Sequence, residues 1–422
     1  MSPLLLPRRT ADEFQSRKRG GVPANILAEA AVIVERVRSG GEEALREYTT
    51  RFEDCAPGEP LYLTGEILRS HLEELPEDER SRIERIADRI RTFARSQRAA
   101  LAPVDTTVPG GRAGHRIDPV DGAGCYAPGG RYPLPSSVLM TAVTARVAGV
   151  RSVWVASPRP APITLAAAAV AGADGVLAAG GAHAIAALAF GVGPIPPSDV
   201  VVGPGNLYVT AAKQLLAGQV EIDMLAGPSE LVIVADASAD PAWVAADLLA
   251  QAEHDPDALP VLISIDAELP SLVERAIERQ LEDLPTASTV RTALANGGAI
   301  VCETEDAACL ACDTIAPEHL QLSVSNAEAW PDRLHHYGAL FIGERAAVVF
   351  GDYGVGPNHV LPTGGTARAR GGLSVMDFLR VRTWIRADPD LDPDLIEDVA
   401  WFARQEGLEA HARAAEIRRG ES

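Results

Sequence analysis

The length, composition and charge of the chain limit what it can be. Its 422 residues are 47% hydrophobic and 23% charged, which is enough apolar material for two to three globular domains. The formal net charge of −20 argues against a nucleic-acid partner, because binding phosphates requires clustered Lys and Arg. Residues 1–20 do not have the pattern of a signal peptide, and the apolar runs are too short to span a bilayer. We therefore expect a cytoplasmic protein without a membrane partner.

Hydrophobic periodicity changes along the chain. Apolar residues spaced by three and four predict amphipathic helices over 27–52 and 76–99. From about residue 120, short β-branched runs alternate with helical stretches. One series of predicted strands covers 152–157, 175–180 and 199–203, and a second covers 230–235, 260–265, 299–303 and 339–343. This alternation predicts an α/β fold of two similar doubly wound, incomplete Rossmann-like modules, with small helical N- and C-terminal segments.

The five cysteines do not form a disulfide framework, because they are odd in number and scattered. Cys309 and Cys312 make one CxxC pair, which could serve a metal or redox role. Because no second pair of metal ligands follows, we interpret them as small apolar residues of a helix.

Two polar pairs could carry chemistry. Gln251 and His254 come late in an apolar helix, three residues apart, so they share a face and could hold a metal or cap the helix end. Glu318 and His319 follow Pro317 and could be a general acid–base pair. Pro and Glu are also common at a helix start for local reasons.

Two further clusters are weaker on their own. Asp352 and His359 lie in a glycine-rich segment that we expect to be a tight loop after a strand formed by residues 348–350. Glu406 and His411 are five residues apart, so a bend at Gly407 would be needed to bring them together.

Three glycine-rich segments, 125–137, 178–191 and 201–213, lie where a strand-like stretch gives way to a helical one. Backbone amides at such places can bind a pyrophosphate, although for each segment alone an ordinary strand-to-helix turn is the better interpretation. No GxGxxG pattern follows a strand and opens a helix, so the usual dinucleotide-binding motif does not predict NAD.

Taken together and in order, the motifs resemble the histidinol dehydrogenase family over about residues 25–415. They are PGG, GPGN, AGPSE, QAEH, PEHL, GDY with NHVLPT, GLSV with DF, and EGL with AH. The resemblance implies zinc-dependent oxidation of L-histidinol to L-histidine through L-histidinaldehyde with two NAD⁺, the last steps of histidine biosynthesis. Another small alcohol as the substrate of the same machinery is one alternative. A zinc hydrolase that uses Glu318 with metal-bound water is another.

The resemblance also implies site residues. The zinc ligands, about one ion per subunit, would be Gln251, His254, Asp352 and His411, with Glu318 and His319 as the acid–base pair. Substrate contacts would come from Ser229, Gln251, His254, His319, Asp352, His359, Glu406 and His411, and NAD contacts from Tyr126, His183 and Asn206. The family usually has Gln where this chain has His183. Imidazole can also donate a hydrogen bond, so we expect altered cofactor affinity rather than its loss.

The same resemblance implies the domain organisation. We expect an N-terminal helical segment over 1–20 and a first α/β domain made of 21–125 and 231–373. A second α/β domain, on the NAD side, would be inserted over 126–230. A C-terminal helical domain over 374–422 would reach the partner subunit of a homodimer whose active sites are shared.

Overall fold

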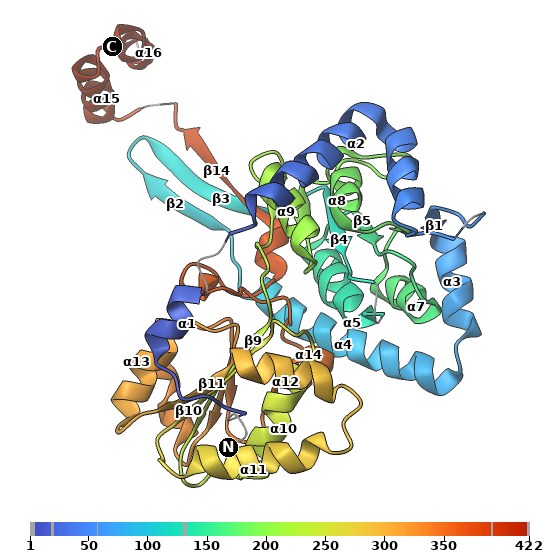
Figure 1. The fold of residues 1–422 in the computed structure, drawn as a ribbon. Helices are drawn as coiled ribbons and strands as arrows, with labels where there is room; N and C mark the ends of the chain where they lie inside the picture. The colour runs from blue at the N-terminus through green and yellow to red at the C-terminus, as the bar shows by residue number, and fades with distance from the viewer. Residues whose placement is uncertain (1–4, 18–20, 57, 130–132, 390, 420–422) are drawn as a thin grey trace.

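The computed structural model describes residues 5–17, 21–56, 58–129, 133–389 and 391–419. Two α/β units lie side by side, and a narrow arm leads away from them to a separate pair of helices (Figure 1). The predicted fold class, two α/β modules with parallel sheets, is confirmed. Within the described residues, no helix has both the length and the apolar composition needed to cross a bilayer.

The first unit is built on a six-stranded sheet of order β1-β6-β5-β4-β7-β8, in which only the β1–β6 pair is antiparallel. Val153 and Val155 of β5 face one hydrophobic core, and Trp154 and Ala156 face the other, as the alternation of a strand requires. Its strands are β1 (Tyr62–Thr64), β4 (Gly122–Tyr126), β5 (Ser152–Ala156), β6 (Gly175–Leu177), β7 (Val200–Val202) and β8 (Glu221–Ile222). Its helices are α2 (Ala24–Arg51), α3 (Gly65–Glu74), α4 (Glu77–Ala99), α5 (Pro135–Val138), the π-helical turn η1 (Leu139–Val143), α6 (Thr144–Ala148), α7 (Pro162–Ala171), α8 (Gly181–Phe190) and α9 (Leu207–Leu216).

The second unit is built on a five-stranded, wholly parallel sheet of order β11-β10-β9-β12-β13. Strand β9 again alternates, with Leu231 and Ile233 in one core and Val232 and Val234 in the other. Its strands are β9 (Glu230–Ala235), β10 (Leu259–Ser264), β11 (Gly298–Val301), β12 (His319–Ser323) and β13 (Ala339–Ile342). Its helices are α1 (Ala11–Arg17), α10 (Pro241–Ala252), α11 (Leu269–Leu281), α12 (Ala287–Asn296), α13 (Glu305–Ile315) and α14 (Val348–Tyr353).

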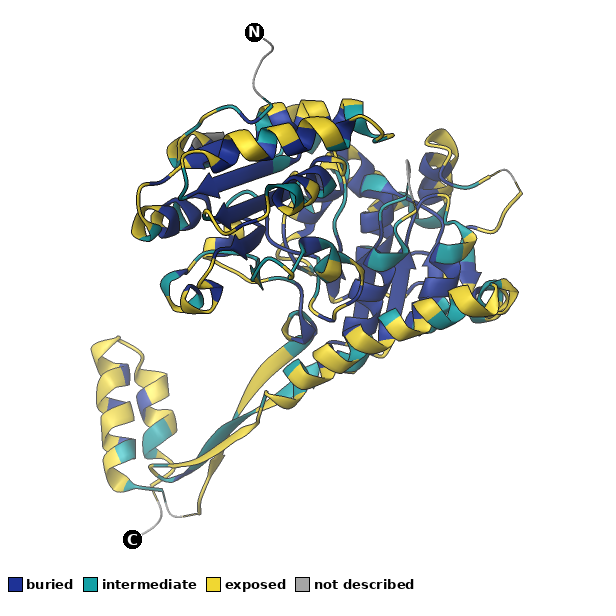
Figure 2. Cartoon of the chain, turned by 90° about the horizontal axis from the view of Figure 1, so that it is seen from below, coloured by how far each residue is buried: buried dark blue, intermediate teal, exposed yellow. Residues whose placement is uncertain are grey.

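The arm is a three-stranded antiparallel sheet of order β14-β3-β2, made of β2 (Val104–Val108), β3 (Gly111–Pro119) and β14 (Leu379–Ala387). It leads to α15 (Pro393–Gln405) and α16 (Glu409–Glu416), and both the arm and the helix pair are largely exposed (Figure 2). The core between these two helices consists of alanines, whereas Trp401, Phe402 and Ile417 are exposed. This helix pair, residues 393–416, is too small to bury its own apolar surface.

The predicted domain boundaries differ from the grouping in the structure. Helices α2, α3 and α4 pack on the helices of the first unit, because their apolar stripes join its two hydrophobic cores. Residues 21–125 therefore do not join 231–373. The segment predicted as 1–20 contributes α1, which packs on α13 of the second unit, while residues 1–4 and 18–20 lie outside the described part.

Two local predictions were also wrong. The C-terminal segment 374–422 is not wholly helical, because β14 completes the arm by pairing along its whole length with β3. Residues 348–350 are not a strand but the first turn of α14, so Asp352 is presented by a helix rather than by a loop.

Candidate active site

Two predicted pairs of residues meet at the amino-end edge of the five-stranded sheet. Glu318 and His319 stand where β12 begins, and His319 lies opposite Leu231 of β9. Helix α10 follows β9 and returns antiparallel to it, so its end brings Gln251 and His254 back to the same edge. His254 lies beyond the last helical residue, and its N–H donates to the backbone oxygen of Gln251 at 3.4 Å.

Glu230, the first residue of β9, holds both members of the acid–base pair. Oε2 of Glu318 accepts the backbone N–H of Glu230 at 2.8 Å, and Oε2 of Glu230 accepts the N–H of Glu318 at 3.3 Å. Nδ1 of His319 lies 2.9 Å from the backbone oxygen of Glu230. A carbonyl oxygen only accepts, so Nδ1 carries a proton and Nε2 bears the lone pair of the neutral ring.

Nε2 of His319 is therefore the atom placed to accept a proton. It is buried without a hydrogen-bond partner among the described residues, and Oδ1 of Asp352 lies 3.8 Å from it. Burial lowers the pKa of His319, but the charge and hydrogen bond of Glu318 and the charge of Asp352 outweigh burial and raise the pKa to about 9. A cation on Asp352 would offset this negative charge and lower the pKa of His319, making it a better base near neutrality.

Three of the four predicted metal ligands surround one small cavity. Gln251, His254 and Asp352 all line it, beside Leu231 at the start of β9. Gln251 is 3% exposed and its Nε2 has no partner in the described chain, so the protein does not fix the amide and its oxygen can turn to the cavity. One amide oxygen, one imidazole nitrogen and one carboxylate suit zinc and leave a position open. No group of three His, Cys, Asp or Glu residues suited to a metal occurs within the described residues. The candidate set here has only two residues of those types, His254 and Asp352, and its third member is the amide of Gln251.

His359 and Ser229 flank the same region. Nδ1 of His359 lies 2.9 Å from the backbone oxygen of Asp352, so the imidazole braces the turn that carries this carboxylate, and its Nε2 lies 3.5 Å from Oγ of Ser137. Ser229 is half-buried and directly precedes Glu230, with its backbone oxygen accepting from Leu259. Both positions are compatible with the predicted contacts to substrate.

Glu406 and His411 are not brought to this cavity by their own chain. Both are exposed at the helix pair 393–416, which Figure 1 shows well apart from both α/β units. The predicted bend is present, because Gly407, with φ of 77°, separates α15 from α16. A glycine suits this left-handed conformation.

The predicted cofactor residues lie at a different place, the carboxyl-end edge of the six-stranded sheet. Gly180 and Gly181 follow β6, and Asn206 follows β7 and caps α9 by accepting from the N–H groups of Tyr208 and Val209. Ligands of open α/β sheets commonly bind at this edge. His183 and Asn206 line one cavity there, while Tyr126 is buried beside it, and its hydroxyl accepts the N–H of Gly181 at 3.3 Å.

The loop before Asn206 is fixed by a buried ion pair that the sequence did not single out. Lys213 pairs with Asp223, and its Nζ donates to the backbone oxygen of Gly203 at 2.9 Å. Asp223 in turn accepts the N–H of Gly203 at 2.6 Å. The backbone N–H and the backbone oxygen of Gly203, the first glycine of the GPGN loop, are thus both hydrogen-bonded to this ion pair.

The cysteines occupy structural positions. Burial raises the pKa of Cys125 to about 12, so its thiol is not a nucleophile at neutral pH. Cys309 and Cys312 are buried on α13, where burial raises the pKa of each thiol. Their interpretation as helix core residues agrees with this placement.

The fold and the cavity together define a class of protein. The chain has two doubly wound units and a buried carboxylate–imidazole pair beside candidate metal ligands. It also has a separate cavity at the carboxyl-end edge of a sheet. This arrangement is that of an α/β oxidoreductase with a nucleotide cofactor.

Comparison with known proteins identifies the family. The pattern described as histidinol dehydrogenase matches residues 17–419, and the chain belongs to this family. Histidinol dehydrogenase of Thermus thermophilus is 45% identical over 414 residues, 97% of this chain and 99% of that protein. The enzyme of Caulobacter vibrioides is 43% identical, over 95% of this chain and 94% of that protein. A crystal structure of histidinol dehydrogenase from Elizabethkingia anophelis superposes with a TM-score of 0.92 at 30% identity, covering 99% of both chains. The predicted family and the predicted class, an NAD-dependent oxidoreductase, are confirmed.

Proposed function

We propose that this chain oxidises L-histidinol to L-histidine through L-histidinaldehyde, consuming two NAD⁺. The observation that carries the proposal is the position of His319 Nε2, which is buried, has no hydrogen-bond partner among the described residues, and lies 3.8 Å from Oδ1 of Asp352, a residue that lines the small cavity with Gln251 and His254. A base at this atom can act on a substrate bound beside Asp352, and the related enzymes are named for histidinol.

Each residue has a defined part in the proposed reaction. His319 Nε2 accepts the alcohol proton while hydride passes from the carbinol carbon to the nicotinamide ring, giving the aldehyde and NADH. Glu318 then removes a proton from water as the water oxygen attacks the aldehyde carbon, and the carbonyl oxygen takes up a proton from solvent, giving the hydrate. His319 accepts a hydroxyl proton of the hydrate as a second hydride reaches a second NAD⁺, giving the carboxylic acid. Between steps, His319 and Glu318 return their protons to solvent.

Gln251, His254 and Asp352, with His411 of the partner subunit, would hold one zinc ion. Zinc bound there supplies a Lewis acid that fixes substrate nitrogens and orients the carbinol carbon. The buried setting of Glu318 and His319 excludes bulk water from the pair, and Ser229, His359 and Glu406 of the partner subunit would complete the contacts to substrate.

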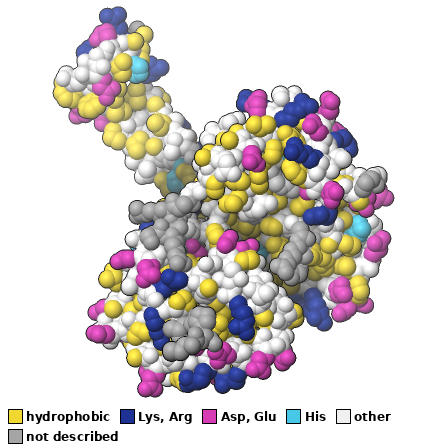
Figure 3. All heavy atoms as spheres, in the orientation of Figure 1, with side chains coloured by type: hydrophobic (Ala, Val, Ile, Leu, Met, Phe, Trp, Pro, Cys, Tyr) yellow, Lys and Arg dark blue, Asp and Glu magenta, His cyan; other side chains and the backbone are white. Residues whose placement is uncertain are grey.

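The proposed site is shared between the subunits of a homodimer. The helix pair 393–416 exposes Trp401, Phe402 and Ile417, at 60%, 59% and 80% of their surfaces, which a second subunit would cover. The arm β14-β3-β2 carries these helices away from both α/β units, as Figure 2 and Figure 3 show. Reaching across would bring Glu406 and His411 to the partner's Asp352.

Zinc content tests the ligand set directly. We expect about one zinc per subunit in the purified protein, and His254→Ala should lower zinc content and activity together, because one of four ligands is lost. His115→Ala, which changes a half-buried imidazole of the arm, is a matched control and should keep its zinc. Wild-type zinc content in His254→Ala, or full activity after thorough removal of zinc, would contradict the assignment.

A further inference from the structure

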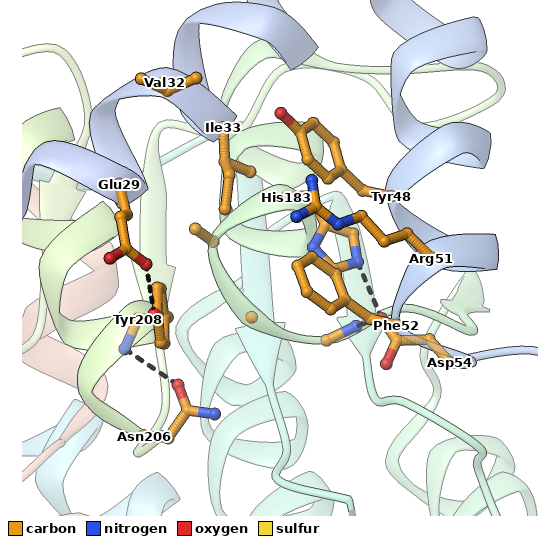
Figure 4. A pocket seen from close by; sticks show the side chains of 13 residues that line it. Glu29, Val32, Ile33, Tyr48, Arg51, Phe52, Asp54, His183, Asn206 and Tyr208 are labelled. Atoms are coloured by element: carbon orange, nitrogen blue, oxygen red, sulfur yellow. Dashed lines mark hydrogen bonds and ion pairs between the residues drawn. The ribbon is translucent and has the colours of Figure 1, made fainter. Parts of the chain in front are cut away.

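The cavity that contains His183 lies away from the acid–base pair. It has a volume of about 680 Å³ and lies between α2 and the starts of α8 and α9. Glu29, Tyr208 and Asn206 lie toward one end, and His183, Arg51 and Asp54 toward the other (Figure 4). It shares no lining residue with the cavity at Asp352. A dinucleotide whose nicotinamide reacts at His319 would therefore place its other end, the adenosine, in this cavity.

His183 is held rigidly in this cavity. Its ring stacks with Tyr48 and Phe52, with centroid separations of 5.9 and 5.5 Å, and it is 2% exposed. Its Nε2 lies 2.8 Å from Oδ2 of Asp54. The same oxygen accepts the backbone N–H of Gly180 at 2.8 Å. Neither the position nor the rotation of the imidazole is left free.

The hydrogen bonds of Asp54 also fix the tautomer. An amide N–H only donates and a carboxylate only accepts, so the Nε2 of His183 must carry the proton of the ring. Nδ1 of the neutral ring then presents a lone pair. That atom is buried and has no hydrogen-bond partner among the described residues.

A glycine lies next to Nδ1 of His183. Gly181 has a φ of 59°, and a Cβ at this position would come within 3.7 Å of Nδ1. A larger side chain there would fill the approach to the imidazole. An unpaired buried acceptor costs free energy in the absence of a ligand, and a ligand N–H would satisfy it.

We infer that His183, positioned by Asp54, recognises adenine by accepting a hydrogen bond from its exocyclic amino group, and so selects the base of the cofactor. The inference rests on the proposed use of NAD⁺. Asp54 is a positioning residue in this account, because it acts through the imidazole and fixes which ring nitrogen is the acceptor. Asp54→Asn and His183→Gln are therefore the informative variants.

Nicotinamide hypoxanthine dinucleotide tests the inference, since it replaces the exocyclic amino group of adenine with a carbonyl oxygen. We expect the wild type to bind this analogue about tenfold or more weakly than NAD⁺ by calorimetry, because an acceptor would face the lone pair of Nδ1. The same ratio should appear in KM with kcat little changed. The acetylpyridine adenine dinucleotide, altered at the other end, should bind about as well as NAD⁺.

Variants of His183 and Asp54 distinguish the parts that these two residues have in recognising adenine. In His183→Gln the side-chain amide can turn to donate or accept, so the analogue should bind nearly as well as NAD⁺. In Asp54→Asn the ratio of the dissociation constants of the analogue and NAD⁺ should fall, while zinc content stays at one per subunit. The double variant Asp54→Asn with His183→Gln should have the same ratio as His183→Gln alone. Tyr208→Phe, altered at the other end of the cavity, should keep the wild-type ratio.

Equal binding of NAD⁺ and the hypoxanthine analogue by the wild type would overturn the inference. A preference for the hypoxanthine analogue would also overturn it, because it would indicate a doubly protonated imidazole whose Nδ1 donates. Discrimination against the acetylpyridine analogue alone would show that the cavity holds nicotinamide instead. Absence of any NAD⁺ binding would instead refute the proposed function, so the two failures are distinguishable.

Discussion

Activity should return to about a quarter of wild type when His254→Ala and His411→Ala proteins, each nearly inactive, are refolded together. Half of the randomly paired dimers are then mixed, and a mixed dimer has one site with both lesions and one with neither. The structure supports this expectation because His254 lines the cavity of the main body, whereas His411 is exposed on the distant helix pair 393–416. The measurement is NADH formation after co-refolding, with heterodimers counted by two different affinity tags.

A second pair of variants serves as the control for this experiment. His254 and Asp352 line the same cavity of one chain, so a mixed dimer of His254→Ala and Asp352→Asn keeps one lesion in each site and should regain nothing. No recovery in the His254–His411 mixture, despite demonstrated heterodimers, would rule out the shared site. Recovery in the control mixture would show that ligands from the main body are themselves exchanged between subunits.

Replacing the acid–base pair should separate the two half-reactions. His319→Asn should slow oxidation of both histidinol and histidinaldehyde by about 10²–10⁴-fold, because Nε2 is the base in each hydride transfer. Glu318→Gln should slow oxidation of the aldehyde far more than oxidation of the alcohol, because only the aldehyde step needs activated water. Each hydride transfer is followed by the absorbance of NADH in single-turnover experiments with either substrate.

Glu318 has a second part in the structure that the experiment must control. Its Oε2 accepts the N–H of Glu230, and Gln can still accept there through its amide oxygen, so Glu318→Gln should keep the fold. Thermal unfolding and zinc content should therefore match the wild type. Equal losses in both half-reactions for Glu318→Gln would contradict the division of labour between Glu318 and His319.

The parallel sheets could be predicted from the sequence because their strands are buried on both faces. Runs such as 152–157 and 230–235 are short, apolar and rich in β-branched residues, and helical stretches separate them. The arm lacked this signal. Strand β14 alternates exposed arginines with exposed apolar residues and covers no core, so its composition resembled that of a charged helical segment.

Which sheet a helix covers could not be predicted from local pattern. The apolar stripes of α2 and α4 require only an apolar partner. Their packing in the unit of the six-stranded sheet depends on strand order, which is a long-range property. Strand β12 was missed because its five residues include polar His319 and Gln321, both buried through tertiary contacts.

Most of the candidate site followed from the ordered motifs, but the residues that position it did not. The spacing of Gln251 and His254 placed them together, and the structure brings Asp352, which the resemblance had implied, to the same cavity from far along the chain. Glu230 belongs to the AGPSE motif and follows Ser229, a predicted substrate contact, so the sequence did contain a signal for it. Asp54 had none, because its relation to His183 depends on a contact across 129 positions.

The stoichiometry of NADH formation tests the central proposal most directly. With a limiting amount of L-histidinol and excess NAD⁺, we expect two NADH per histidinol consumed, with L-histidine as the product, and we expect a strong chelator to abolish the reaction until zinc is restored. One NADH per histidinol, with release of the aldehyde, would show an alcohol dehydrogenase only. Zinc-dependent turnover of a substrate without NAD⁺, and no NADH from histidinol, would contradict the account.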